Sequence, residues 1–572
     1  MDKQKKERSQ LRNTLSTLTP SLKRVIIFSV FTSLLVLTPS VYMLEVYGRV
    51  LNSRNYQTLL VLIVVVIGAY VLMETLNWVR RQIMANAARS FDEQVREPLL
   101  HAMFAAQLSN MKAGGSKAMQ DLKIVCDFLP SQAFLAFIDA PLALVVLVFI
   151  FLINPVLGWF SVAAALILIL VGVYNEPRIR KPMEQATQYG MEARRYAEDV
   201  IRNAQVIESM GMFNQVHNRW LLRQNAFVEQ QATASNLAGS SMTFSKVVQT
   251  LLGSLLLGIG AWFTIRGELS GALMIVASIL GGRVIAPLLQ LFGSWRQVED
   301  VRESFLRLER LLDMFPVPQK SMSLPAPKGF LKLEGVTAMS PETKVTILKG
   351  IGFKVPPGGA LAVVGSSASG KTTLARILVG VWPSMTGTVR LDGSDISTWE
   401  KTELGPHIGY LPQNVELFDG TIGENIARFG EVDEEKLHNA CSMVGLTELI
   451  ESLPQGYDTE IGYDGAFLSG GQRQRVALAR AVYGLPEFVV LDEPNANLDE
   501  AGDVALLNTI RQLKEHGSTV IIMTHRRNIL SVMDYMLVLV NGMIHKFGPC
   551  REVLAELNPK ATKISADGQA AT

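Results

Sequence analysis

The sequence has 572 residues, of which 48% are hydrophobic and 19% charged, and its mean hydropathy is +0.23. A chain of this length is too long for one hydrophobic core, so we expect at least two domains. The formal net charge of +2 gives no reason to expect a nucleic-acid partner, and the three cysteines lack the spacing of a zinc site or a disulfide framework.

Residues 1–24 are polar and rich in Lys and Arg. They lack a small-residue cleavage site of the kind that ends a signal peptide, so we expect a retained cytosolic tail.

Six segments between residues 25 and 291 are apolar enough to cross a bilayer, which takes about 20 residues each. The basic tail predicts that the tail, the long charged loops and the C-terminal half all face the cytosol. Short connections at Asn154-Pro155 and at residues 265–268 make two hairpins of the last four spans. The expected spans are Val25–Val46, Thr58–Val79, Phe134–Ile153, Val156–Tyr174, Val247–Thr264 and Leu269–Leu291.

A few residues within the spans do not suit lipid. Arg283 either faces a watery cavity or a partner, or it marks the cytosolic end of a tilted helix. Helix kinks are expected at three prolines and interfacial positions for two acids, namely Pro39, Pro141, Pro287, Glu45 and Asp139.

A different kind of sequence follows the sixth span. A polar helix should run to about Met314, and the prolines of residues 315–329 predict an interdomain linker. From residue 330 to 556, short β-rich runs alternate with helical stretches, which predicts an α/β domain. We expect strands over 331–336, 360–365, 488–493, 519–525 and 535–540, and disorder over 557–572.

A phosphate-binding loop stands between the second of these strands and a helix. The segment fits the pattern GxxxxGK[ST], in which backbone N–H groups surround a phosphate at a helix N-terminus. Lys371 would bind the β and γ phosphates of a nucleotide, and the Thr372 hydroxyl would bind Mg²⁺. The expected nucleotide-binding residues are Gly365, Ser366, Ser367, Ala368, Ser369, Gly370, Lys371, Thr372 and Thr373.

Two adjacent acids end the strand near residue 490. Asp492 is placed to hold the magnesium ion, and Glu493 could act as the base that activates a water molecule for attack on the γ-phosphate. An acidic pair after a strand is often only a solvated turn, but the phosphate loop upstream favours the catalytic interpretation.

Between these two motifs lies LSGGQ, with Ser469, Gly470, Gly471 and Gln472. This segment resembles the signature of the ABC transporter ATPases. The resemblance implies a membrane all-α six-helix domain followed by an α/β P-loop ATPase domain. It also implies a homodimer in which each nucleotide lies between the phosphate loop of one copy and Ser469 of the other.

The same resemblance assigns further residues. Gln413 corresponds to the glutamine that contacts magnesium and water, and His525 to the switch histidine at the γ-phosphate. Asp499 belongs to the loop that crosses the dimer interface, and Tyr463 to a segment that touches the opposite membrane domain. Most relatives carry an adenine-stacking aromatic about 25 residues before the phosphate loop, whereas this chain has Met339 and Ser340 there.

Segments of the membrane half, such as SVYMLEVYGRVLNSRNYQTL and LSGALMIVASILGGRVIAPL, are similar to those of type I secretion ATPases of the protease and lipase secretion class, the PrtD-like family. This resemblance implies ATP-driven export of an unfolded polypeptide with a C-terminal signal. The implied location is the inner membrane of a Gram-negative cell, and the implied partners are a membrane fusion protein and an outer-membrane channel. A lipid or drug flippase shares every ATPase motif and is the alternative, and a membrane-anchored ATPase without transport is a third.

Overall fold

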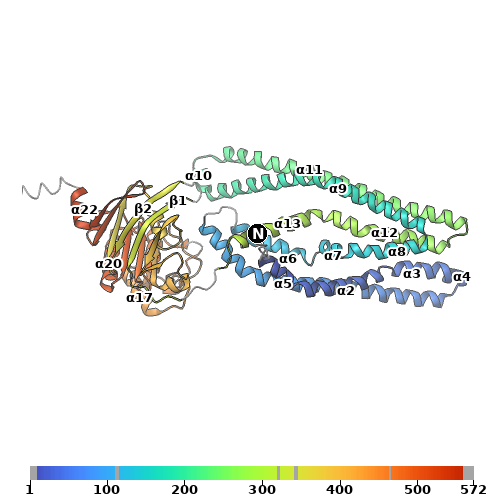
Figure 1. Ribbon diagram of the computed structural model, residues 1–572, viewed down its shortest axis with the longest axis horizontal. Coiled ribbons are helices and arrows are strands. Elements are labelled where there is room, and N and C mark those ends of the chain that lie inside the picture. Colours follow the sequence, from blue (N-terminus) through green and yellow to red (C-terminus); the bar gives the residue numbers. More distant parts are fainter. Residues whose placement is uncertain (1–9, 110–114, 318–322, 341–344, 463–464, 558–572) are drawn as a thin grey trace, which may run out of the picture. The chain divides into compact units, whose positions relative to one another are not determined.

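The computed structural model describes residues 10–109, 115–317, 323–340, 345–462 and 465–557, and the chain divides into two compact units after Val317. This break falls inside the proline-rich segment. The first unit consists of helices, and the second combines helices with two β-sheets (Figure 1).

The first unit is built from long helices, and the longest run without a break from apolar into charged sequence. A helix of 53 residues such as α5 is roughly 80 Å long, whereas the hydrocarbon core of a bilayer is about 30 Å thick. The helices are α1 (Gln10–Thr17), α2 (Thr19–Leu35), α3 (Thr38–Glu45), the π-helical turn η1 (Val46–Val50), α4 (Leu51–Ser53), α5 (Tyr56–Leu108), α6 (Gly115–Phe128), α7 (Gln132–Asp139), the 3₁₀ turn η2 (Ala140–Leu142), α8 (Ala143–Ile153), α9 (Pro155–Arg202), α10 (Ala204–Ser209), α11 (Phe213–Ile265), α12 (Gly271–Gly293) and α13 (Trp295–Met314).

Six helical segments of the described chain are long and apolar enough to cross a membrane, as the sequence predicts. They are α2–α4, α5, α7–α8, α9, α11 and α12. Large apolar side chains along them point outward, including Leu60 at 66% exposure and Leu170 at 67%. Exposed apolar side chains are expected on helices that lie in lipid, because a helix makes its backbone hydrogen bonds internally.

Part of the expected tail, residues 1–24, is helical. Residues 1–9 lie outside the described residues. Helix α1 covers Gln10–Thr17, and α2 begins at Thr19. Leu11 is buried in a core with α5, α6 and α13, and Arg12 forms an ion pair with Glu309 of α13 at 2.6 Å. The apolar Leu11 and Leu18 give this segment a buried face that its overall polarity conceals.

Prolines interrupt the helices at two of the three expected places. The chain leaves α2 at Leu35 and starts α3 at Thr38, with Pro39 in the first turn, where a missing N–H is tolerated. Pro141 lies in η2, between α7 and α8. Pro287 lies inside α12, which continues to Gly293.

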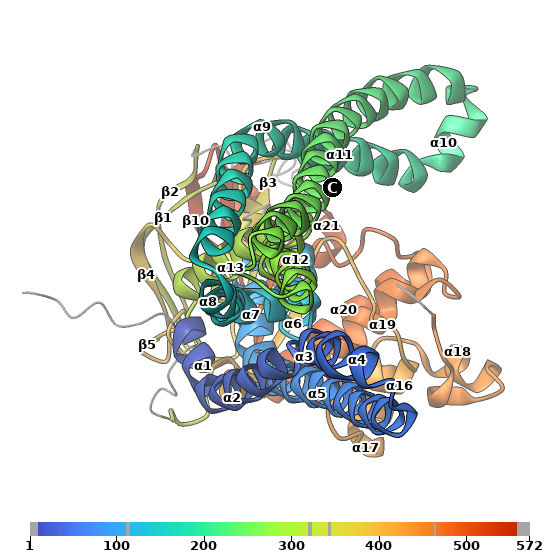
Figure 2. The same cartoon turned by 90° about the vertical axis from the view of Figure 1, so that its right-hand side faces the viewer.

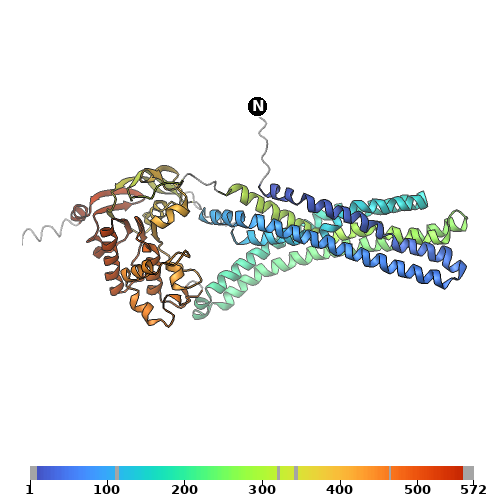
Figure 3. The same cartoon turned by 90° about the horizontal axis from the view of Figure 1, so that it is seen from below.

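Helices α9 and α11 run side by side and are joined at one end by the short helix α10 (Figures 1 and 2). The view from below shows the same pairing along most of their length (Figure 3).

Asn154 caps α9 by accepting from Val156 N at 2.8 Å, and Pro155 occupies the first helical position. The expected hairpin of the third and fourth spans is therefore confirmed.

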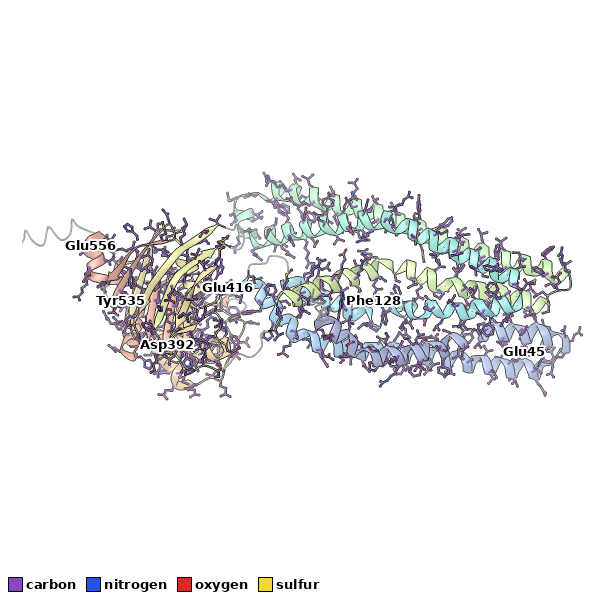
Figure 4. All side chains as sticks on the ribbon, in the orientation of Figure 1. Glu45, Phe128, Asp392, Glu416, Tyr535 and Glu556 are labelled. Atoms are coloured by element: carbon purple, nitrogen blue, oxygen red, sulfur yellow. The ribbon has the colours of Figure 1, made fainter. Side chains whose placement is uncertain are left out.

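Two buried ionic networks tie distant helices of this unit together. Arg80 of α5 is 1% exposed and donates to Asp139 of α7 at 2.6 Å. Asp121 of α6 is 2% exposed and accepts two hydrogen bonds from Arg307 of α13, each at 2.8 Å. Glu45 pairs with Arg49 near the end of the bundle far from Phe128, and its interfacial position stays a prediction (Figure 4).

The second unit contains two sheets. One is antiparallel, in the order β2-β1-β4-β5, and the other has six strands in the order β10-β9-β3-β8-β7-β6. The strands are β1 (Leu331–Met339), β2 (Thr346–Val355), β3 (Ala360–Gly365), β4 (Thr386–Leu391), β5 (Ser394–Asp395), β6 (Ile408–Leu411), β7 (Phe488–Asp492), β8 (Thr519–Met523), β9 (Tyr535–Val540) and β10 (Met543–Pro549).

The larger sheet separates two cores because its central strands are apolar on both faces. Alternate residues such as Val489 and Leu491 pack on one side against α16–α20, whereas Val490 packs on the other side against α14 and the antiparallel sheet. The helices are α14 (Lys371–Leu378), α15 (Lys401–Leu404), the 3₁₀ turns η3 (Gly405–His407) and η4 (Gly456–Asp458), α16 (Ile422–Ile426), α17 (Glu434–Met443), α18 (Thr447–Ser452), α19 (Gly470–Val482), α20 (Glu500–His516), α21 (Arg527–Leu530) and α22 (Cys550–Leu557).

All five expected strands are present. Strands β2, β4, β5, β6 and β10 have no counterpart in the sequence analysis, because glycine and polar residues interrupt the apolar pattern or, in β5, the strand has only two residues.

Candidate nucleotide-binding site

The phosphate loop connects β3 to α14 in a backbone conformation that few residue types allow. Ala368 has a φ of 62° and Gly370 a φ of 104°, both in the left-handed region. A β-carbon on Gly365 would lie 2.5 Å from Leu539 O, so only glycine fits there. Lys371 extends back across the loop and donates to the carbonyls of Gly365 and Ser366 at 2.8 and 3.1 Å.

The order of the strands brings the other expected residues to the same edge of the sheet. Strands β3, β8, β7 and β6 are neighbours and parallel, so their carboxyl ends lie together. The phosphate loop follows β3, His525 follows β8, Glu493 follows β7 and Gln413 follows β6. This arrangement explains how residues about 160 positions apart in the sequence reach one site.

Hydrogen bonds link three of these residues directly. The Thr372 hydroxyl donates to Gln413 Oε1 at 3.3 Å, and Gln413 Nε2 donates to Glu493 Oε2 at 3.1 Å. Gln413 therefore bridges the phosphate loop and the acidic pair. His525 is exposed at the same edge, and no contact with the other three residues is found in the described part of the chain.

Asp492 is the most buried of the polar residues at this edge, with 0% exposure. Neither of its carboxylate oxygens has a hydrogen-bond partner among the described residues. Burial raises the pKa of Asp492; the nearby Thr372 hydroxyl lowers it, and the neighbouring Glu493 carboxylate raises it. Two unpaired oxygens close to Thr372 are a donor set that fits a small divalent cation such as Mg²⁺, which takes oxygen ligands and few protein groups.

Glu493 adopts a strained backbone conformation, with a φ of 49°. Its N–H donates to Met523 O on β8 at 3.0 Å, which holds the turn at the end of β7. Such a conformation costs of the order of 1 kcal/mol or more in a residue with a β-carbon, and it directs the carboxylate toward Gln413.

The LSGGQ segment begins α19. Ser469 caps the helix by accepting from Gln472 N, and the Gln472 side chain accepts from Ser469 N at 2.8 Å, so the pair forms a capping box. A β-carbon on Gly471 would lie 3.0 Å from Asn497 O. The contacts found for this turn within the described chain join it to Asn497, and none joins it to the phosphate loop of the same copy.

Two protein-family descriptions match the chain, one for each unit. Residues 24–285 match the family described as "ABC transporter transmembrane region", and residues 348–496 match the family described as "ABC transporter". The "Type I secretion system ATP-binding protein PrsD" of Rhizobium meliloti (strain 1021) is 38% identical over 552 residues, which cover 95% of each protein. The chain belongs to the ABC exporters of type I secretion systems.

Other relatives agree with this family. The "Toxin RTX-I translocation ATP-binding protein" of Actinobacillus pleuropneumoniae is 28% identical over 93% of this exporter and 76% of its own length. A solved structure described as a bacterial Atm1-family ABC exporter with ATP bound superposes with a TM-score of 0.81 at 21% identity, covering 97% of this chain and 99% of that one. The fold expected from the sequence is therefore confirmed, as is ATP hydrolysis coupled to transport by a multi-pass inner-membrane protein with a cytosolic ATPase domain.

One residue of the exporter's site has no counterpart in the sequence analysis. Gln474 of α19 is fully buried and donates to Pro494 O at 3.0 Å, so it fastens the signature helix to the turn that carries Glu493. Gln474 lies two residues after LSGGQ, but only the structure shows that it is buried and gives its partner.

Three expectations stay predictions. Asp499 caps α20 by accepting from Gly502 N at 2.8 Å, so it has a role within its own copy. Tyr463 lies outside the described residues. Met339 ends β1 and Ser340 follows it, so no aromatic residue occupies this position.

Proposed function

We propose that this exporter moves an unfolded polypeptide with a C-terminal secretion signal out of the cell, driven by ATP hydrolysis at the site described above. The observation that carries the proposal is the similarity to a type I secretion protein along 95% of both chains. Relatives named for translocation of RTX-I toxin and of leukotoxin, from Actinobacillus pleuropneumoniae and Mannheimia haemolytica, support polypeptide cargo.

In this proposal the residues at the sheet edge share the chemistry of hydrolysis. Glu493 accepts the proton of the attacking water, and Gln413 orients that water because it already donates to Glu493. Lys371 leaves its carbonyl partners to bind the β and γ phosphates, and His525 contacts the γ-phosphate. The backbone N–H groups of the loop, followed by Thr372 and Thr373, surround the phosphates.

Magnesium, when bound, would supply positive charge that neutralises the phosphates. Thr372, Gln413 and Asp492 would hold it. The unpaired carboxylate oxygens of Asp492 support this assignment.

We infer that the working unit is a homodimer. Ser469, Gly470 and Gly471 open a helix whose N-terminus favours anions, yet the contacts of this turn lead away from the phosphate loop of its own copy. The γ-phosphate contacts of Ser469, Gln472 and the Asp499 loop are therefore supplied to a second copy. Each nucleotide would then require both chains.

A cavity in the helical unit supports a polypeptide cargo. It has a volume of about 690 Å³ and lies between α9, α11 and the start of α13. Its walls carry amide, hydroxyl and thioether groups beside charged residues, a mixture that can hydrogen-bond a peptide backbone without selecting a sequence. These groups belong to Asn175, Gln188, Gln231, Ser235, Ser241, Met183 and Met191.

The remaining assignments follow from the family. We propose a membrane domain at 25–314, a linker at 315–329 and an ATPase domain at 330–556. Assembly with a membrane fusion protein and an outer-membrane channel would carry the cargo across both membranes in one step.

The test compares proteins in the growth medium of cells that carry the wild-type chain, no chain, or Glu493→Gln. Proteins that appear only with the wild type are the cargo, and their C-terminal segments should alter ATP hydrolysis by the purified exporter. Export is contradicted if the three media are identical and if lipids or amphipathic drugs alone alter hydrolysis, a result that would identify a flippase.

A further inference from the structure

Four charged residues lie within the six expected membrane spans, and two of them are paired inside their own copy. Glu45 and Asp139 form ion pairs with nearby arginines at 3.3 and 2.6 Å. The other two are Glu74 in α5 and Arg283 in α12, which are opposite in sign. Both are exposed, and neither has a hydrogen bond or an ion pair within the described residues. A charge inside a bilayer is costly without a partner or water, so each requires something that its own copy does not supply.

The two charges lie at a similar depth in the membrane. The second and sixth spans both run from the outside to the cytosol, because the basic tail is cytosolic and successive spans alternate in direction. Glu74 follows the outer end of its expected span, at Thr58, by about 24 Å of helix, and Arg283 follows Leu269 by about 21 Å. A difference of about 3 Å is well within the reach of an arginine side chain, so the two charges can meet between adjacent helices.

Helix α5 presents Glu74 in an open hollow on its outer surface. The hollow has a volume of about 490 Å³, and its other walls are Tyr70, Val71, Thr75 and Trp78. A guanidinium group fits such a site, because it forms two hydrogen bonds with a carboxylate and stacks on an aromatic face. None of the apolar window of this span is buried in the single copy, whereas at least 17% is buried in each of the other five spans. Helix α5 therefore has free surface for a helix from elsewhere.

The exposed face of α12 is unlike a surface that meets lipid. Among the side chains that the structure describes, the exposed residues of α12 are small or polar, namely Gly271, Arg283, Ala286, Gln290 and Gly293. Each of the other five spans exposes large apolar side chains, such as Leu60 in α5 and Leu170 in α9. Small residues allow another helix to approach closely, so the face of α12 that carries Arg283 suits contact with protein.

We infer that Glu74 of one copy pairs with Arg283 of the second copy, and that this pair joins the two membrane domains within the bilayer. A two-fold symmetric dimer makes the contact twice, once in each direction. The second copy is the favoured partner because the charges left over in the spans are one acid and one base at matching depth. The inference rests on the proposed homodimer and adds the residues that hold it together inside the membrane.

Cysteine cross-linking tests which copies supply the two residues. Two differently tagged full-length chains are expressed together, one with Glu74→Cys and the other with Arg283→Cys, after the native cysteines have been replaced by alanine. Membranes are treated with a short bifunctional thiol reagent, because an ion pair can hold Cα atoms further apart than the roughly 7 Å that a disulfide permits. A linked product that carries both tags is expected.

The matched control replaces Glu74→Cys by Leu60→Cys, at an exposed residue about 21 Å away along the same helix, and it should give no linked product. The inference is wrong if Glu74→Cys also gives none. It is equally wrong if linkage occurs only when both cysteines are placed in the same chain.

Charge substitutions measure whether the pair holds the dimer together. The rate of subunit exchange is followed between tagged full-length dimers in detergent. Glu74→Gln and Arg283→Gln should each accelerate exchange by at least about 10-fold, because either change leaves the opposite charge without its partner. The double variant should exchange no faster than the faster single variant, and combining Glu74→Arg with Arg283→Glu should restore exchange to within about 3-fold of wild type. Glu93→Gln, at an exposed glutamate of α5 outside the span, should have no effect.

Single effects that multiply in the double variant, without recovery in the exchanged pair, would show that the two charges act separately and refute the inference. Unchanged exchange in both single variants would also refute it and would leave Arg283 facing water. Failure of the proposed homodimer is a separate result, since the wild-type chain would then have the mass of a monomer in light scattering. A wild-type dimer that lacks the link between positions 74 and 283 contradicts the pair alone.

Discussion

Replacing Glu493 with Gln separates proton transfer from the positioning of groups at the nucleotide. Glutamine keeps an oxygen where Glu493 Oε2 now accepts from Gln413 at 3.1 Å, so this hydrogen bond can persist. The left-handed backbone at this residue costs glutamine as much as glutamate, so the folded state should be equally stable. The change therefore removes basicity and little else.

The expected loss of hydrolysis can be estimated because the substitution removes the base and little else. Removal of a general base typically lowers a rate by 10²–10⁴, which corresponds to about 2.7–5.4 kcal/mol of barrier. Phosphate release by the purified exporter should fall at least about 100-fold, whereas the dissociation constant for ATP should change by less than about 2-fold. Nucleotide should remain trapped as ATP in a closed dimer.

The matched control is Glu500→Gln, the same chemical change at an exposed residue in the first turn of α20. It should hydrolyse ATP at the wild-type rate. Turnover by Glu493→Gln within about 3-fold of wild type would exclude Glu493 as the base. A large loss of ATP affinity would instead show that the carboxylate acts in binding.

Three other substitutions test neighbouring features. Lys371→Ala should weaken binding of ATP itself, measured by nucleotide displacement, because the phosphates lose their main cationic partner; unchanged affinity would contradict this. Gln474→Leu should slow hydrolysis with little change in ATP affinity, because the tie from α19 to the turn carrying Glu493 is lost; steady-state phosphate release decides. Asp121→Asn should lower stability by about 1.5–3 kcal/mol in thermal unfolding, because it weakens a nearly buried charged pair, whereas Asp300→Asn, at an exposed pair, should cost less than about 1 kcal/mol.

Much of the site could be predicted from the sequence because its parts lie in short contiguous motifs. The phosphate loop, the acids after β7 and the LSGGQ helix each combine a strand or helix end with the residues that act there. Parallel strands then bring these ends to one edge of a sheet. The order of the strands, and with it the contact of Gln413 with Glu493, required the structure.

The ionic networks of the helical unit had no such signal. Asp121 and Arg307 are 186 positions apart, and Arg80 and Asp139 are 59 apart. In sequence Asp121, Arg307 and Arg80 look like ordinary charges on polar helix faces, and Asp139, within an apolar span, does not reveal its partner. Only tertiary packing buries Asp121 and Arg80 against their partners, so pairs of this kind follow from tertiary structure and not from local pattern.

The pairing of Asp121 with Arg307 has a mechanical consequence. Helix α13 is the last helix of its unit, and the chain leaves it at Met314 toward the ATPase unit. A pull or twist on that exit reaches α6 at once, since a forked ion pair with two parallel hydrogen bonds resists both sliding and rotation. Force applied to α13 would therefore be carried by α6 as well, whereas α12 ends at Gly293, directly before the Ser294 that precedes α13.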